Sequence, residues 1–220
     1  MSSRSGSGRT RTRGRDAATE SRSTSARGAG PGVAVPGPAG LHGDGRRWSL
    51  VLVRAEDVGP AQKGRAVEVL GTGEGTDSLM VAYMPDAGVS RAARQAAGDA
   101  FAEAGLQHSD IDHVMNYDAF AHLPWIGLES MGFFEPGAAA RFIADGGTSP
   151  GGALPLNTNG GGLAYTHTGM YGMFALTESV RQIRGGEADA TRGVVGTSLA
   201  LGFGGMFTAA AVTILGRPPR

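Results

Sequence analysis

The sequence contains no cysteine. This absence excludes disulfides, zinc sites built on thiolates, and any mechanism in which a cysteine of this chain attacks a substrate. The apolar runs are short, and none approaches the ~18 residues that a membrane-spanning helix needs. The chain also shows no apolar segment of the kind that directs secretion. We therefore expect a cytoplasmic protein.

The first 45 residues lack large apolar side chains. Serine, glycine, arginine and proline dominate this segment, which leaves little from which to build a core. Within the first 30 residues, seven arginines face only Asp16 and Glu20, a net charge of +5, and the remaining residues carry −5. No aromatic side chain is present to stack on bases, which argues against a nucleic-acid arm. We predict a disordered tail over residues 1–45 and one folded domain over residues 46–217.

From residue 50 onward, strand patterns alternate with helix patterns. Short runs rich in valine and leucine predict strands over residues 50–53, 66–70, 111–115 and 154–156. Apolar periodicity predicts helices over residues 90–104, 119–131 and 135–145, the second of them interrupted or begun by Pro124, and one from about residue 170 to 184. The end of the chain predicts a hairpin of strands over residues 193–201 and 206–215. This order predicts an α/β fold, a layered domain with a mixed sheet and helices on its faces.

A glycine-rich segment, Gly71-Thr-Gly-Glu-Gly75, follows one of the predicted strands. Its spacing is one residue short of G-x-G-x-x-G and no convincing helix follows, so a dinucleotide site is not expected. The helix predicted next begins with Ser90 as its N-cap and carries many alanines on one face, which favours close packing against a sheet or another helix. His108 and His113 lack the companion ligands of a metal site, so we expect no metal.

The strongest functional pattern is Asn-Thr-Asn-Gly-Gly-Gly-Leu-Ala-Tyr-Thr-His-Thr-Gly-Met-Tyr-Gly over residues 157–172. The three glycines from Gly160 to Gly162 leave the backbone free to adopt positive φ and to approach a ligand closely. Tyr165 and His167 follow at the start of a predicted helix, where the helix dipole keeps an imidazole neutral and able to act as a base or a donor. The alternative is that His167 only satisfies free N–H groups at the helix start.

This run resembles the C-terminal half of the thiolase superfamily, as do the helix segment Glu178-Ser-Val-Arg-Gln-Ile-Arg-Gly185 and the terminal Gly202-Phe-Gly-Gly-Met206. The bacterial sterol-carrier or lipid-transfer-protein thiolases are the branch it is most similar to. In that family a strand leads to an Asn-Gly-Gly turn and a catalytic histidine, and the resemblance places this histidine at His167. The family's proline after the histidine is Thr168 here. The matches keep the family's order from about residue 43 to residue 217, which makes their combination specific.

A second motif, Asn116-Tyr-Asp-Ala-Phe120, resembles the family's Asn-Glu-Ala-Phe motif, whose asparagine holds an oxyanion-hole water. When the two are aligned on Ala-Phe, the asparagine position is Tyr117 and the glutamate position is Asp118. The resemblance also suggests that residues 76–86 line the thioester or acyl channel.

The terminal glycine loop of thiolases carries a cysteine that acts as acid and base. Counted back from Gly204 and Gly205, the position of that cysteine is Leu201. Thiolase chemistry also requires a nucleophilic cysteine for its acyl-enzyme. The usual thiolase mechanism is therefore not expected here.

The resemblance implies another chemistry that needs no nucleophile. A branch of thiolase-like proteins cleaves β-hydroxyacyl-CoA thioesters by a retro-aldol reaction, notably on steroid side chains, and uses tyrosines in the site. The reaction needs a base for the β-hydroxyl proton and donors for the enolate. We predict that a tyrosine takes the proton and that the other tyrosine or the histidine holds the enolate oxygen or protonates its carbon. The predicted catalytic residues are Tyr117, Tyr165 and His167, and the predicted supporting residues are Asp118, Gly161, Gly162, Gly204 and Gly205.

Some of these residues also have a purely structural interpretation. Tyr165 can pack its ring against the sheet, as buried tyrosines commonly do. Tyr171 shares a helix face with His167 and is expected in the core rather than in the site. Asp118 can serve as the N-cap of the helix that follows it.

The resemblance implies no bound cofactor, with coenzyme A as part of the substrate. The expected partners are an acyl-CoA, a second copy or a thiolase N-terminal half, and a zinc-ribbon/OB-fold protein, with neither nucleic acid nor membrane. Two alternatives to the lyase stay open. One is a thiolase-type acyltransferase resembling acetyl-CoA acetyltransferase, and the other is a truncated, inert paralogue that acts only as a partner module.

Overall fold

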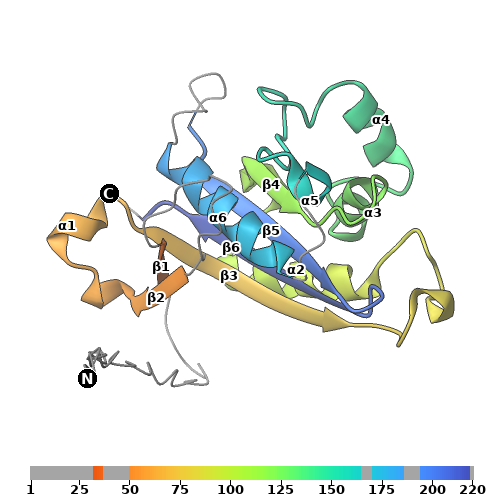
Figure 1. Cartoon of the computed structure of the whole chain (residues 1–220), viewed down its shortest axis with the longest axis horizontal. Helices are drawn as coiled ribbons and strands as arrows, with labels where there is room; N and C mark the ends of the chain where they lie inside the picture. Colours follow the sequence, from red (N-terminus) through yellow and green to blue (C-terminus); the bar gives the residue numbers. More distant parts are fainter. Residues whose placement is uncertain (1–31, 37–49, 165–169, 186–193, 219–220) are drawn as a thin grey trace, which may run out of the picture.

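The computed structural model describes residues 32–36, 50–164, 170–185 and 194–218. A six-stranded sheet forms its centre, with strand order β2-β1-β3-β6-β5-β4 (Figure 1). β4 and β5 pair in parallel and the other neighbouring strands pair antiparallel, so the predicted mixed sheet is confirmed. The strands are β1 (Gly32–Pro36), β2 (Leu50–Arg54), β3 (Val67–Thr76), β4 (His113–Asn116), β5 (Thr197–Gly204) and β6 (Ala209–Gly216).

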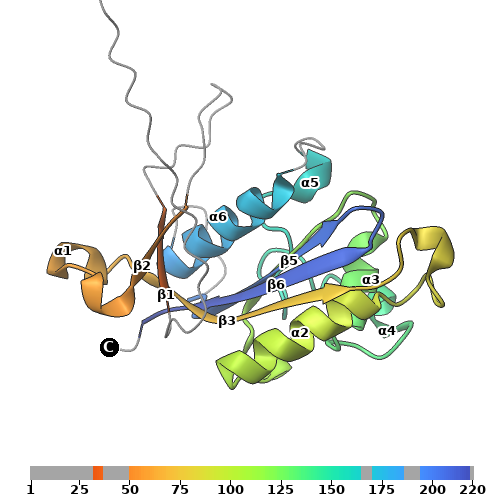
Figure 2. The ribbon, with the colours of Figure 1, turned by 90° about the horizontal axis from the view of Figure 1, so that it is seen from below.

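Two long helices cover opposite faces of this sheet, α2 on one and α6 on the other (Figure 2). The predicted layered α/β architecture is thereby confirmed. The helices are α1 (Pro60–Lys63), α2 (Arg91–Ala104), α3 (Leu123–Ser130), α4 (Ala138–Ala144), α5 (Gly161–Ala164) and α6 (Tyr171–Arg184). Short 3-10 turns occupy Ala55–Asp57, Val81–Tyr83 and His108–Asp110. Within the described residues, no helix is long and apolar enough to cross a membrane.

The interface between β3 and α2 is built from glycine and alanine. A Cβ atom added to Gly73 would lie 2.0 Å from the carbonyl oxygen of Ala96, which is far inside contact distance. The glycines recur at every second residue of the strand and meet alanines at every fourth residue of the helix, so both sets lie on facing surfaces. The pairs are Gly71 with Ala100, Gly73 with Ala96, and Gly75 with Ala92. The strand was predicted to end at residue 70 and is longer because the glycines belong to its helix-facing side.

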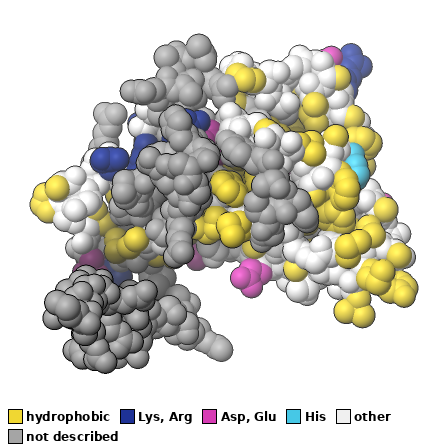
Figure 3. Space-filling view, in the orientation of Figure 1, with side chains coloured by type: hydrophobic (Ala, Val, Ile, Leu, Met, Phe, Trp, Pro, Cys, Tyr) yellow, Lys and Arg dark blue, Asp and Glu magenta, His cyan; other side chains and the backbone are white. Residues whose placement is uncertain are grey.

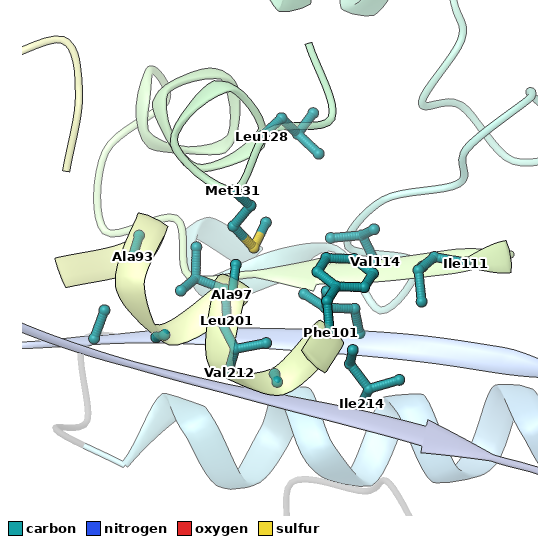
Figure 4. Packing of buried hydrophobic residues seen from close by; sticks show 14 of the residues in the cluster. Ala93, Ala97, Phe101, Ile111, Val114, Leu128, Met131, Leu201, Val212 and Ile214 are labelled. Carbon is teal, nitrogen blue, oxygen red and sulfur yellow. The ribbon is translucent and has the colours of Figure 1, made fainter. Parts of the chain in front are cut away.

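The main core lies on the α2 side of the sheet (Figure 4). Ala93, Ala97 and Phe101 of α2 pack there with apolar residues of the strands and of α3. Helix α2 is anchored as predicted, because the Ser90 hydroxyl accepts the N–H of Ala93 at 3.1 Å and Gly105 ends the helix with φ +64°. Two smaller apolar clusters lie under α6 on the other side.

Several predicted boundaries differ from the structure. Helix α3 begins at Leu123 rather than at residue 119, so Pro124 stands in its first turn, as one of the two predicted alternatives had it, and does not interrupt the helix. Helix α4 begins at Ala138 rather than at residue 135, because Gly137 has φ +86°. Residues 154–156 form one isolated parallel bridge, between Leu156 and Val114, rather than a full strand.

The two ends of the chain also differ from prediction. β5 continues through Gly204, so the hairpin turn is shifted toward Thr208 from the predicted residues 202–205. Within the tail predicted to be disordered, Gly32–Pro36 forms β1, whose backbone pairs with β2 and β3. Backbone pairing of this kind needs no large apolar side chain, which is why composition did not reveal it. The boundary at residue 46 stays a prediction.

Candidate active site

The site is organised by the alternation of side chains along β4. His113, Met115 and Tyr117 share the sheet face that α6 covers, where Met115 and Tyr117 pack with Tyr171. Val114 lies in the core on the opposite face. The alternation follows from strand geometry, in which successive side chains point to opposite faces. Tyr117 therefore stands at the carboxyl end of β4, beside the first turn of α6.

Tyr117 is held by its backbone and by its ring. Its N–H donates to the carbonyl oxygen of Leu201 at 3.0 Å, and its ring centroid lies 5.4 Å from that of Tyr171. Burial raises the pKa of the Tyr117 phenol above its ordinary value, and the nearby charge of Asp118 raises it further. The phenol is therefore protonated at neutral pH and is able to donate a hydrogen bond. Tyr171 is buried in the core, as predicted.

Asp118 connects the end of β4 to the glycine turn. Its carboxylate accepts a short hydrogen bond from the N–H of Gly162 and a longer one, 3.5 Å, from the N–H of Leu163. A Cβ atom on Gly161 would lie 2.0 Å from Oδ2 of Asp118, and Gly161 has φ +71°, so only glycine fits there. The interpretation of Asp118 as an N-cap for the helix that follows it in sequence is wrong. The carboxylate instead caps the start of α5, 44 residues later.

Two asparagines hold the base of the turn. The Asn157 side chain accepts the N–H of Asn116 and donates to its carbonyl oxygen, both at 2.8 Å. Asn157 itself has φ +51°, a conformation that asparagine tolerates better than most residues. Asn159 then accepts the N–H of Gly161 at 2.9 Å. The turn is thus tied to the end of β4 by side chains at both of its ends.

The terminal loop contributes less than the resemblance implied. The side chain of Leu201, at the position of the thiolase cysteine, is fully buried in the core on the α2 side. Leu201 stands opposite Asn116 in the register of β5 and β4. Gly204 and Gly205 follow three and four residues later, roughly 10 Å further along the strand direction. They lie at the hairpin tip, and their supporting role stays a prediction.

Two predicted catalytic residues, Tyr165 and His167, lie outside the described residues. Their roles stay predictions. Of the predicted site residues inside the described part, the structure brings together Tyr117, Asp118 and the glycine turn.

A buried polar network on the same face of β4 was not predicted. His113 and Glu178 are almost fully buried, and both hydrogen-bond to the hydroxyl of Thr158. One signal in the sequence points to it: His113 lies four residues before Tyr117 on an alternating strand, and therefore on the same face. Within the part of the chain that the structure describes, no group of three or more histidine, aspartate and glutamate side chains could hold a metal.

Apolar side chains are exposed beside the turn and beyond the end of β3. Phe120 lies two residues after Asp118 and Leu163 follows Gly162 directly, and more than half of each side chain is exposed. Hydrophobic side chains also gather at the end of the molecule where β3 leads into α2 (Figure 3). Leu79, the most exposed of these, lies in the segment predicted to line an acyl channel, and that role stays a prediction.

Comparison with known proteins gives a consistent result. A family model described as thiolase C-terminal domain-like matches residues 73–217. A 17-hydroxy-3-oxo-4-pregnene-20-carboxyl-CoA lyase of Mycobacterium tuberculosis is 43% identical over 96 residues, which cover 43% of this chain and 24% of the lyase. A steroid side-chain-cleaving aldolase of Thermomonospora curvata is 46% identical over 87 residues, covering 39% of this chain and 21% of the aldolase.

A solved structure also shares the fold. The structure of an Ltp2-ChsH2(DUF35) aldolase superposes on this chain with a TM-score of 0.66 and 31% sequence identity. The matched region covers 78% of this chain and 44% of the aldolase chain. The chain spans less than half the length of that aldolase, and about a fifth to a quarter of the length of the two curated relatives.

Proposed function

Because the chain belongs to the family of thiolase C-terminal domain-like proteins, we propose that it supplies the catalytic groups of an acyl-CoA lyase. The reaction is the retro-aldol cleavage of a β-hydroxyacyl-CoA that carries a lipid or steroid side chain. Two relatives bear the names of a steroid-derived carboxyl-CoA lyase and a steroid side-chain-cleaving aldolase, which supports the proposal.

One observation carries the proposal most directly. Tyr117 presents a protonated phenol at the end of β4, beside a glycine turn that Asp118 holds in place. A retro-aldol step develops negative charge on the thioester oxygen, and a fixed neutral donor stabilises that charge. The phenol is suited to this role because it carries its proton at neutral pH. A phenol that stays protonated at neutral pH is a poor base, so we give Tyr117 the enolate oxygen rather than the β-hydroxyl proton.

The bond changes then balance without a nucleophile. A base removes the proton from the β-hydroxyl, the Cα–Cβ bond breaks, and a carbonyl compound leaves as the Cα electrons pass into the thioester enolate. Tyr117 donates to the enolate oxygen, and protonation at carbon releases the shortened acyl-CoA. Tyr165 or His167 serves as the base, and the other of the two protonates the enolate carbon.

The substrate is an acyl-CoA thioester, with coenzyme A carried by the substrate rather than bound as a cofactor. The exposed side chains of Phe120 and Leu163 beside the turn suit an apolar acyl portion. We propose that activity requires a thiolase-like N-terminal half or a second copy. We also propose a zinc-ribbon/OB-fold partner, and the two components named in the similar Ltp2-ChsH2(DUF35) aldolase are consistent with a partner module.

A thiolase-type acyltransferase is the less favoured alternative. Acyl transfer in thiolases passes through cysteines, and the position of the terminal-loop cysteine is a core leucine, Leu201. The second alternative, an inert paralogue that serves as a partner module, is tested by the same experiment as the lyase.

The experiment measures cleavage of a β-hydroxyacyl-CoA by the full chain, alone and together with the N-terminal half of a thiolase-like aldolase. Products are followed by liquid chromatography and mass spectrometry as the carbonyl fragment and the shortened acyl-CoA. We expect cleavage in the combined sample. Tyr117→Phe removes one enolate donor and is expected to lower kcat about 100-fold.

The control is Thr177→Val, which removes a hydroxyl bonded to the carbonyl oxygen of Met173 within its own helix, outside the predicted channel and site. Activity that survives Tyr117→Phe combined with Tyr165→Phe would refute the assignment of the tyrosines. No cleavage in either sample would favour the inert partner module.

A further inference from the structure

A chain of buried hydrogen bonds runs from β5 through β4 and the glycine turn to α6. The His113 ring contacts the Ser198 hydroxyl through Nδ1 at 2.8 Å and the Thr158 hydroxyl through Nε2 at 3.0 Å. Thr158 in turn contacts Glu178 and Gln182 of α6. Thr158 belongs to the turn itself, between the asparagines that tie the turn to β4. The network therefore joins the turn to the sheet and to the helix at one atom, Oγ1 of Thr158.

The charge at the helix end of the network is fixed by its partners. Glu178 accepts hydrogen bonds from Thr158 at 2.6 Å, from Gln182 at 2.7 Å and from Arg181 at 2.8 and 3.0 Å. Burial alone raises the pKa of Glu178, but the hydrogen bonds from Arg181, Thr158 and Gln182 together lower it below its ordinary value. Glu178 is therefore an ionised carboxylate that can only accept.

The proton positions follow from this charge. The Thr158 hydroxyl has one proton, and it goes to Glu178 because the carboxylate has none to give. The two other contacts of Thr158 Oγ1 must then be donated by Gln182 and by Nε2 of His113. His113 therefore carries a proton on Nε2 and donates it to the Thr158 hydroxyl. Gln182 also donates to this hydroxyl, and the hydroxyl donates to Glu178.

We infer that Glu178, Thr158 and His113 act as a positioning network that sets the turn over residues 157–163 against the end of β4. Asp118 holds the turn at its glycine end, and the network holds it at its asparagine end. The inference rests on the proposed function, because its value to the protein is the placement of this turn beside Tyr117. None of the three side chains is assigned a contact with the substrate, so they are positioning residues.

The test compares two threonine-to-valine changes in the full chain. Thr158→Val removes the donor and the acceptor of the network, whereas Thr177→Val on α6 removes only a hydroxyl bonded to Met173 of its own helix. We expect the amides of Gly160, Gly161 and Gly162 to exchange with solvent about tenfold faster in Thr158→Val and unchanged in Thr177→Val. Thr158→Ser keeps the hydroxyl and is expected to restore the protection.

Kinetics supply the second readout, with the N-terminal half present. Thr158→Val is expected to lower kcat about tenfold with little change in KM, because a misplaced turn weakens the transition state more than substrate binding. If the amides of Gly160, Gly161 and Gly162 exchange no faster in Thr158→Val than in Thr177→Val, the inference is overturned. An unchanged kcat despite faster exchange would also overturn it. If the unmutated protein shows no cleavage, the proposed function fails, whereas the exchange data still decide whether the network positions the turn.

A further test, a nitrogen-15 NMR spectrum of the unmutated protein, does not require the Thr158→Val variant to fold. The expected result is a His113 ring that carries a proton on Nε2. A ring with its proton on Nδ1 alone would contradict the direction of the network and overturn the inference.

Discussion

The carboxylate of Asp118 accepts the backbone N–H of Gly162, 44 residues later in the sequence. This bond joins the residue after Tyr117 to the glycine turn and needs Gly161 to have no side chain. The glycine end of the turn is therefore placed relative to Tyr117 by one buried carboxylate and one glycine.

Removing the carboxylate should loosen the turn. In Asp118→Ala, two N–H groups at the start of α5 lose their acceptor, and the loss of such a cap lowers the free energy of unfolding by about 1–2 kcal/mol. The control is Asp86→Ala, which removes an exposed carboxylate bonded to the N–H of Gly88. Urea denaturation measures the free energy of unfolding of both variants. Equal losses of this free energy would mean that Asp118 does not anchor the turn.

A methyl group at Gly161 should be more costly than one at another left-handed glycine. Gly161→Ala meets both the strain of φ +71° and the Asp118 carboxylate. Gly105→Ala meets only the strain of φ +64°, because nothing lies within 4 Å of its added Cβ. We expect losses of about 3 and about 1 kcal/mol respectively, measured by urea unfolding. A smaller loss for Gly161→Ala than for Gly105→Ala would contradict the close approach of Asp118.

The glycine face of β3 should not accept alanine. In Gly73→Ala the added Cβ lies against the backbone of α2, which has to move away from the sheet, at a cost of about 3 kcal/mol. Gly98→Ala, on the exposed side of α2, has open space and should stabilise the protein by about 0.5–1 kcal/mol. Thermal unfolding followed by circular dichroism should therefore shift in opposite directions for these two variants. A shift in the same direction would argue against the close packing of β3 on α2.

Part of the loss of folding stability at low pH should come from protonation of Glu178. Its folded pKa lies below its unfolded pKa, so the stability it contributes is present above the unfolded pKa of about 4.3 and is lost as pH falls through the folded value. Glu178→Gln cannot titrate, so we expect lower stability at neutral pH and a flatter decline between about pH 5 and pH 3. Glu103→Gln, at an exposed site bonded to Thr72, is the control. Melting temperatures are measured across this pH range. A melting temperature that falls as steeply with pH in Glu178→Gln as in the unmutated protein would contradict the prediction.

The elements that sequence predicted well are those with local signals. Helix α2 has a serine cap, a glycine stop and an apolar face within 16 residues, and its bounds were confirmed. The mixed sheet followed from the order of strands and helices. The glycines of β3 misled the prediction, because a strand that lacks side chains on one face reads locally as a loop.

The contacts that shape the site are long-range and left little local signal. The partners of Asp118 and His113 lie 44 and 45 or more residues away, so neither pair is visible as a motif. The sequence identified Asp118 and Gly162 as members of one site only through the resemblance to a family. The bond between them, and the role of Thr158, required the structure.

The segment that follows residue 154 also determines how this sheet can associate with other chains. β4 is an edge strand, and the outward N–H and C=O groups of Val114 and Asn116 are all occupied, by Pro155 and by the backbone and side chain of Asn157. An edge whose groups are occupied offers no template for an added strand. Growth of the sheet by a further strand is therefore blocked at this edge, and any chain that joins the protein here has to do so through side-chain packing.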